Sequence, residues 1–201
     1  MEVYHIIYKP YQVLSQFSSK EGKPCLKDWF RTTPDVYPVG RLDFDSEGLL
    51  ILTNDPFLNQ RLLNPGFAHQ REYWVQVEGV PNQDALDRLA GGVEINLEGK
   101  MYKTRRAGVK LFKEPPRVAE RTPPIRFRKY IPTSWMSLVL TEGKNRQVRK
   151  MTAKVGLPTL RLIRYRIEGL TIEGMMPGDL ISLDKEKIHH ALFSEKAWNH
   201  R

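Results

Sequence analysis

Short apolar runs separated by turns rich in Gly, Pro and Asn recur along the whole chain. They predict strands over 3–8, 36–39, 49–53, 73–80, 135–140, 160–167 and 180–183, and a strand pair within 93–112. The run Leu49–Thr53 is continuously apolar instead of alternating, which predicts a strand buried on both faces.

Four segments carry helix signals. Asp55-Pro56 supplies an N-cap followed by proline at the first helical position, and Asn64-Pro65 ends that helix. Further helices are predicted over 81–89, 146–155 and 185–193. In the third of these four helices, one face carries Val148, Met151, Thr152 and Val155, and Gly156 follows the helix end.

Strands dominate, and the helices fall between groups of strands instead of alternating with each one. This order predicts an α+β fold with a largely antiparallel central sheet flanked by short helices. We expect one catalytic domain over 1–201. Gly/Pro-rich zones near 64–71 and 114–132 are candidate seams, and two subdomains meeting near 64–71 would hold the active-site cleft between them.

Charge narrows the class of partner. The chain has 32 Lys and Arg against 23 Asp and Glu, a formal net charge of +9, which favours a polyanion such as nucleic acid. Two stretches, 99–113 and 143–166, contain six and eight basic residues and no acid. The single Cys25 excludes an internal disulfide and a thiolate zinc site. No apolar run approaches the length of a membrane span, so we expect a soluble, cytoplasmic protein.

The strongest local signal is Gly40-Arg41-Leu42-Asp43 followed by Asp45-Ser46-Glu47-Gly48, directly before the buried strand. Carboxylates held by a rigid strand suit nucleophilic or acid/base chemistry. Three alternatives remain open from these residues alone. The acids could open a calcium-binding loop, form a glycosidase pair, or cap a turn and pair with Arg41.

Two further segments could act with the acids. In Glu142–Met151, Arg149 stands near a helix N-terminus and could keep a carboxylate ionised, whereas the plain interpretation is a basic amphipathic helix. In Arg71–Gly79, Tyr73 or Trp74 could stack on an unpaired base, although aromatic residues in strands are most often core.

Together these segments resemble the RsuA-type family of pseudouridine synthases. The Asp43 segment resembles its catalytic motif, Lys9-Pro10 its opening motif, Glu72-Tyr73 its tyrosine motif and Glu142–Arg149 its basic motif. The order and spacing agree from about Val3 to Leu183. Residues 45–48, 123–126 and 131–135 most resemble the RluE type, which acts on large-subunit ribosomal RNA (rRNA). Many relatives carry an N-terminal S4 RNA-binding module, which we expect to be missing here.

The resemblance implies roles for individual residues. Asp43 would be the catalytic aspartate, Tyr73 would pack on the target base, and Arg149 would pair with the aspartate. Arg71 replaces a lysine that is frequent in the family and would keep a phosphate contact. The basic residues expected to contact RNA are Lys9, Arg41, Arg71, Lys144, Arg146, Lys150, Arg161 and Arg164.

The implied reaction converts a uridine of large-subunit (23S) rRNA into pseudouridine by a monomeric enzyme. Because it is an isomerisation, it requires no cofactor, metal or energy source. It does require a flipped base in a pocket that excludes water. Two other functions are weighed against it: a non-catalytic rRNA-binding or assembly protein, which leaves the acids unexplained, and a glycosidase that releases bases from nucleic acid.

Overall fold

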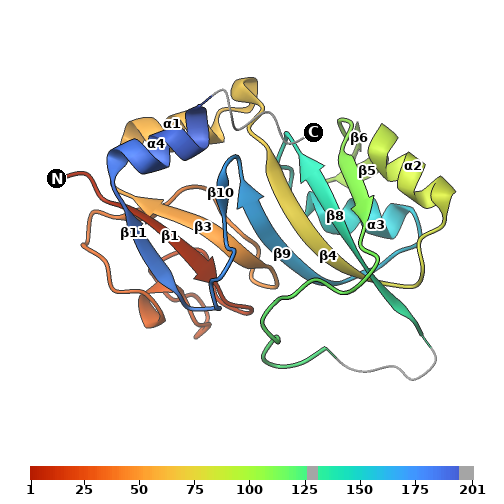
Figure 1. Cartoon of the computed structure of the whole chain (residues 1–201), viewed down its shortest axis with the longest axis horizontal. Coiled ribbons are helices and arrows are strands. Elements are labelled where there is room, and N and C mark those ends of the chain that lie inside the picture. Colours follow the sequence, from red (N-terminus) through yellow and green to blue (C-terminus); the bar gives the residue numbers. More distant parts are fainter. Residues whose placement is uncertain (126–130, 195–201) are drawn as a thin grey trace. The chain divides into compact units, whose positions relative to one another are not determined.

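The computed structural model describes residues 1–125 and 131–194. Part of the predicted loop at 114–132, including Arg126, therefore lies outside the described residues. The chain divides into two compact units: unit 1 is Met1–His69 with Arg164–Arg201, and unit 2 is Gln70–Ile163. Figure 1 shows their elements, and the α+β fold class predicted from the sequence is confirmed.

Unit 1 is built on antiparallel strands in the order β11–β1–β3, with β2 on the far side of β3. Its strands are β1 (Tyr4–Lys9), β2 (Tyr37–Pro38), β3 (Glu47–Thr53), β10 (Leu170–Thr171) and β11 (Leu180–Leu183). Its helices are α1 (Pro56–Leu63) and α4 (Lys185–Phe193), with short 3-10 turns at Leu26–Asp28 and Pro65–Phe67. All seven residues of β3 are buried, as its continuous apolar run predicted.

Unit 2 pairs its strands antiparallel in the order β4–β8–β7, with a separate hairpin of β5 and β6. The strands are β4 (Arg71–Glu78), β5 (Glu94–Leu97), β6 (Lys100–Lys103), β7 (Gly108–Leu111) and β8 (Thr133–Leu140). The helices are α2 (Gln83–Gly91) and α3 (Gln147–Lys154). Strand β9 (Thr159–Ile167) begins in unit 2 and ends in unit 1, where it pairs with β10.

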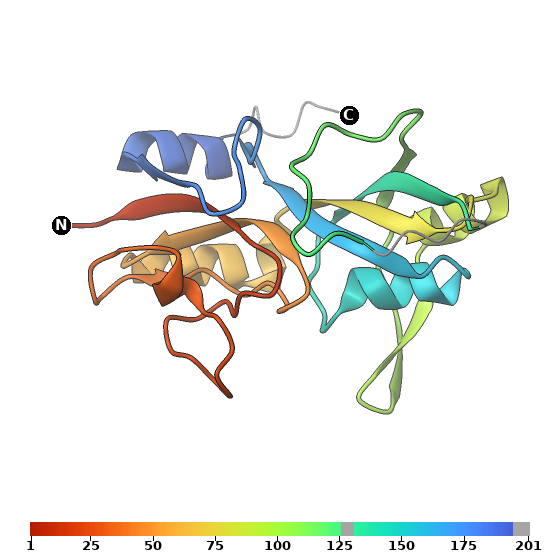
Figure 2. The same ribbon diagram turned by 90° about the horizontal axis from the view of Figure 1, so that it is seen from below.

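The core of unit 2 lies between its strands and its helices. Figure 2 shows α3 lying along one side of the strands. Alternate residues of β4 and β8 point into this layer, as strand periodicity requires. The core joins strand residues Val75, Val77, Met136 and Leu138 to helix residues Leu89, Val148 and Met151.

Most predicted elements are confirmed, and two were missed. Helix α1 begins and ends where its flanking Asp55 and Asn64 predicted, and Gly156 follows α3 in the left-handed conformation with φ 81°. The segment 93–112 contains three strands instead of two. β5 and β6 form the predicted pair, and β7 pairs with β8 instead. The two-residue strand β10 is too short to leave a pattern in the sequence. In the described part of the chain, no helix is long and apolar enough to cross a bilayer.

Candidate active site

Asp43 lies in a tight turn that leads into β3. The N–H of Ser46 donates to the carbonyl of Asp43 at 3.0 Å, which closes the turn. Asp43 and Asp45 are partly exposed, whereas Ser46 and Glu47 are 1% exposed. Glu47 is the first residue of β3 and Gly48 pairs with Lys9 of β1. A calcium-binding loop over 43–54 would need residues 47–53 to curl around an ion, but they form the buried strand β3, so that alternative is wrong.

The backbone on both sides of Asp43 is held by the connection that follows β1. The buried Ser15 hydroxyl donates to the carbonyl of Leu42 at 2.8 Å and accepts the N–H of Leu42 at 3.0 Å, across 27 positions of sequence. On the other side, the N–H of Gln12 donates to the carbonyl of Phe44 at 2.9 Å. Backbone fixed in this way holds the point from which the Asp43 side chain extends, which suits a catalytic group.

Lys9 braces this same connection from inside the protein. Its side chain is fully buried, and Nζ donates to the carbonyls of Pro10 at 2.9 Å and Val13 at 2.7 Å. Burial lowers the pKa of Lys9 to about 7, against the opposing effect of nearby carboxylates, chiefly Glu47. The predicted RNA contact of Lys9 is not supported, because a side chain with no exposed surface cannot reach a phosphate.

Gly48 is required where β3 begins. Its φ is 108°, and a Cβ there would clash with the backbone of Arg164. Arg164 is itself buried, and its Nε donates to the carbonyl of Leu49 at 2.8 Å. Arg164 therefore fixes the start of β3 from the side, close to the turn that carries Asp43.

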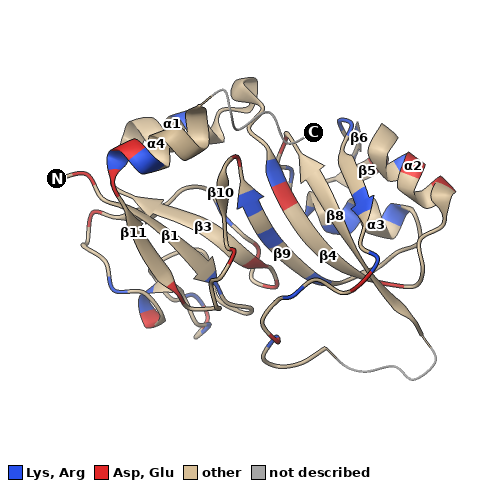
Figure 3. Ribbon diagram, in the orientation of Figure 1, with Lys and Arg blue, Asp and Glu red and all other residues tan. Residues whose placement is uncertain are grey.

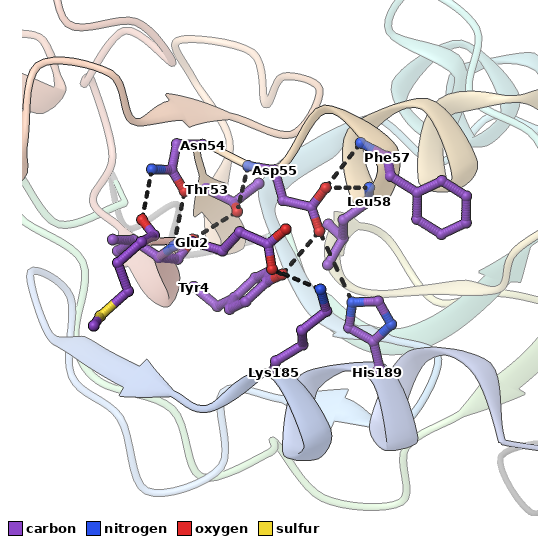
Figure 4. A network of polar contacts seen from close by, with 11 residues as sticks. Glu2, Tyr4, Thr53, Asn54, Asp55, Phe57, Leu58, Lys185 and His189 are labelled. Atoms are coloured by element: carbon purple, nitrogen blue, oxygen red, sulfur yellow. Dashed lines mark hydrogen bonds and ion pairs between the residues drawn. The ribbon is translucent and has the colours of Figure 1, made fainter.

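The opposite end of β3 is held by the polar network shown in Figure 4. Asp55 caps α1, accepting the N–H groups of Phe57 and Leu58 at 2.9 and 3.2 Å, and its other oxygen accepts the Tyr4 hydroxyl at 2.8 Å. Nε2 of His189 on α4 lies 3.9 Å from that oxygen. Although burial alone would raise the pKa of Asp55, the hydrogen bonds from Tyr4 and the two N–H groups hold it below its ordinary value.

The aromatic candidates of unit 2 lie on opposite faces of β4. Tyr73 is partly buried against the core that also contains Val148 of α3, so it lies on the helix-covered face. Trp74 is on the other face, where Nε1 donates to Glu72 at 2.9 Å and the ring meets Phe112 edge-on at 5.4 Å between centroids. Of the two, Tyr73 is the one that shares a face with the helix carrying Arg149.

The first turn of α3 carries the residues of the basic motif. Arg146, at the N-cap position, has a left-handed φ of 50°, and Arg149 is the third residue of the helix. Glu142 and Gln147 are buried beside this turn, and Gln147 Nε2 donates to Glu142 at 2.7 Å. Helix α3 is therefore amphipathic, as the alternative interpretation of this segment predicted. Val148 and Met151 are core residues, whereas Arg146, Arg149 and Lys150 are at least partly exposed.

The other predicted basic residues differ in exposure. Arg41 and Lys144 are exposed and Arg71 is partly exposed. Arg161 is 5% exposed, with its guanidinium 6.0 Å from the centroid of the Trp135 ring. Burial of Arg161 and Arg164 leaves them little surface, whereas Arg41, Lys144 and Arg146 are exposed. In the described ranges, no three His, Cys, Asp or Glu side chains are grouped to hold a metal ion.

Comparison with known proteins identifies the family of this chain. The model of the RNA pseudouridylate synthase family matches residues 3–154, which include Asp43, Tyr73 and Arg149. The chain belongs to this family. It is 47% identical over 174 residues to ribosomal large subunit pseudouridine synthase E of Vibrio vulnificus, covering 87% of this chain and 72% of that protein. It is 48% identical to the protein of the same name from Xanthomonas axonopodis pv. citri, covering 86% and 89%.

A solved pseudouridylate synthase shares the fold. That crystal structure is 22% identical, with a TM-score of 0.76, and the match covers 96% of this chain and 74% of the solved chain. The resemblance to the RsuA-type family, and within it to the RluE type, is confirmed, and the chain is a pseudouridine synthase. The predicted pseudouridine synthase fold is confirmed with it.

The structure groups the predicted pseudouridine synthase residues by unit. Unit 1 contains Asp43 with Lys9, Arg41 and Arg164, and unit 2 contains Tyr73 and Arg149 with the remaining basic residues. Sequence reasoning missed Gln12 and Ser15, which hold the Asp43 turn through backbone contacts and leave no motif. It included Glu142 and Gln147 in the basic motif but assigned them no role. An acid and an uncharged residue within a basic segment were a signal that these two side chains are internal.

Proposed function

We propose that this enzyme converts a uridine of large-subunit rRNA into pseudouridine and that Asp43 is its catalytic aspartate. The observation that carries the assignment of Asp43 is the bracing of its turn by Ser15, Gln12 and Ser46. The substrate class is supported by the names of the two relatives that are 47% and 48% identical. Action in the cytoplasm as a monomer is part of the proposal.

The chemistry balances without any other reactant. The N1–C1′ glycosidic bond breaks, the uracil rotates, and C5 bonds to C1′ while the hydrogen at C5 is released to solvent and N1 gains one. An ionised Asp43 would either attack C1′ or remove a sugar proton. We propose that Tyr73 packs on the flipped base and that Arg149 pairs with Asp43. Tyr73 packs against the core that includes Val148 of α3, the helix that carries Arg149, and this proximity to α3 supports a joint role for Tyr73 and Arg149.

The decisive experiment measures tritium release from large-subunit rRNA labelled with [5-³H]uridine, with no added cofactor. Wild type is expected to release tritium. Asp43→Asn is expected to abolish release while keeping RNA affinity, because the side chain keeps its size and loses only its charge. Asp45→Asn changes a carboxylate on the same turn and is the matched control. Its effect is expected to be milder, because the family pattern assigns catalysis to Asp43 and not to Asp45.

The outcomes separate the competing functions. Equal loss of release in both variants would contradict the choice of Asp43. Release of free uracil would indicate a glycosidase. No release by wild type from naked, folded or particle-bound rRNA would favour the non-catalytic RNA-binding protein. Arg149→Ala is expected to lower the rate of release more than it lowers RNA affinity, and the reverse order would place Arg149 among plain RNA contacts.

A further inference from the structure

Glu142 is a buried acid that joins two basic segments of unit 2. It follows β8 and is 6% exposed. One carboxylate oxygen accepts the Tyr102 hydroxyl at 2.5 Å. The other accepts the backbone N–H of Arg105 at 2.9 Å and the side-chain amide of Gln147 at 2.7 Å. Tyr102 and Arg105 lie 40 and 37 positions earlier in the chain, at the end of β6 and just after it.

The same contacts turn the exposed residues of the β8–α3 loop outward. Gln147 also accepts the backbone N–H of Lys144 at 3.0 Å, so Glu142 and Gln147 close the loop from inside. Gly143, Lys144, Asn145 and Arg146 are left exposed. The ammonium of Lys144 lies 5.0 Å from the centroid of the Tyr102 ring, which places this loop directly beside β6.

These contacts bring the segment that follows β6 beside the β8–α3 loop, and both segments carry exposed cations. We call the surface of these two segments the β6–α3 basic face and define it by the exposed cations Arg105, Arg106, Lys144 and Arg146. Figure 3 shows further Lys and Arg residues on β6 and α3, the elements that adjoin these two segments, whereas the four defining cations lie just outside both elements. The two acid-free stretches of the sequence, 99–113 and 143–166, contribute two residues each to this face. The side chain of Arg105 is 53% exposed, and its Nε lies 3.8 Å from Glu142, so the carboxylate orients the guanidinium without covering the side chain.

We propose that the β6–α3 basic face binds phosphates of the substrate RNA and that Glu142 is the positioning residue that holds its two segments together. The proposal rests on the proposed function, because it takes RNA as the substrate. Clustered cations repel one another, and a polyanion relieves that repulsion. Guanidinium groups bind phosphate oxygens in a bidentate manner, and the Lys144 ammonium and Asn145 amide add donors of the kind that contact a nucleic-acid backbone.

The proposal is tested by the salt dependence of rRNA binding. Removing one cation that neutralises a phosphate should reduce the slope of log affinity against log salt concentration by about 0.7–0.9. Arg105→Ala and Lys144→Ala are each expected to weaken binding of large-subunit rRNA about three- to tenfold at 0.1 M salt and to reduce the slope by that amount. The matched control is Arg88→Ala. Arg88 is a half-exposed arginine of α2 whose side chain donates to Lys154 at the other end of α3, and this variant should bind as wild type does. Wild-type slopes for Arg105→Ala and Lys144→Ala would overturn the proposal.

The positioning role of Glu142 needs a variant that keeps every cation. Tyr102→Phe removes only the hydroxyl that donates to Glu142 and leaves the ring beside Lys144. We expect it to weaken RNA binding about threefold. In the Tyr102→Phe background, Arg105→Ala should then cost less affinity than in wild type, because Arg105 is no longer held in place. If Tyr102→Phe lowers the melting temperature but leaves the effect of Arg105→Ala unchanged, the tie is merely structural and the positioning role is rejected.

Failure of this proposal and failure of the proposed function give different results. If wild type releases tritium from labelled rRNA while Arg105→Ala and Lys144→Ala bind with wild-type slopes, the basic face is rejected and uridine isomerisation stands. If the two variants bind more weakly and with a smaller slope as expected but wild type releases no tritium, isomerisation of this rRNA is rejected and the RNA-binding face stands.

Discussion

Lys9 is a lysine in a position where the charged form is costly. Its amine is fully buried and donates to two backbone carbonyls, and burial lowers the pKa of Lys9 to about 7. The unfolded chain, with an ordinary lysine pKa near 10.5, therefore binds more protons than the folded protein between about pH 7 and 10.5. In that window stability should rise with pH, by at most about 1.4 kcal/mol per pH unit.

Lys9→Met should remove this rise. We expect the free energy of unfolding of wild type, measured by urea denaturation at pH 7, 8 and 9, to increase more steeply than that of Lys9→Met. Lys27→Met, at an exposed lysine of the same unit, is the control and should keep the wild-type slope. A Lys9→Met variant with the wild-type pH dependence would show that Lys9 remains charged when buried.

At the scale of elements, what could be predicted was what leaves a local signal. Helix α1 could be placed from Asp55-Pro56 and Asn64-Pro65 because caps act on the first and last turns alone. The buried β3 could be predicted from its unbroken apolar run. The bracing of Asp43 by Ser15 could not, because the contact joins residues 27 positions apart and any buried hydroxyl in that place would serve.

The burial of three basic residues could not be predicted from the sequence either. Lys9, Arg161 and Arg164 look like surface cations in a basic chain, and only their backbone or ring contacts show them to be internal. The family resemblance identified Asp43 where chemistry alone left Asp45 equivalent. It could not show which of Tyr73 and Trp74 shares a face with α3, since that depends on the register of β4 against β8.

The Asp55 network ties β1, β3, α1 and α4 into one group, and Tyr4→Phe tests it (Figure 4). Loss of a hydrogen bond to an ionised carboxylate should lower the free energy of unfolding by about 1.5–3 kcal/mol at pH 7. The folded-state pKa of Asp55 is lowered, so its contribution to stability is present above its unfolded pKa and is lost as the pH falls through the folded value. The difference between wild type and Tyr4→Phe should therefore narrow in acid, and urea denaturation at pH 7 and pH 3 measures it. An undiminished difference at pH 3 would assign the loss to packing of the ring instead.

At the scale of the whole molecule, the two units differ in how the chain builds them. Unit 1 is discontinuous, and its sheet pairs Tyr4 with Leu183, so β1 and β11 come from opposite ends of the chain. Unit 2 is a continuous segment, and every buried residue of its core cluster lies between Val75 and Leu162. Contacts close in sequence need less loop closure, which favours independent folding of unit 2.

We therefore expect a fragment of residues 70–167, which keeps all of β9, to fold alone with a cooperative thermal transition followed by circular dichroism. The fragment 1–69 is the matched control. It retains β1, β3 and α1 but lacks β11 and α4, so Tyr4 and Asp55 lose the partners that α4 supplies, and it should show no cooperative transition. Adding the fragment 164–201 should restore structure to 1–69, because it returns β11 to the edge of β1. If 1–69 folded alone and 70–167 did not, the core of unit 2 would depend on residues outside its own segment. The two units of the native structure would then not correspond to units of stability.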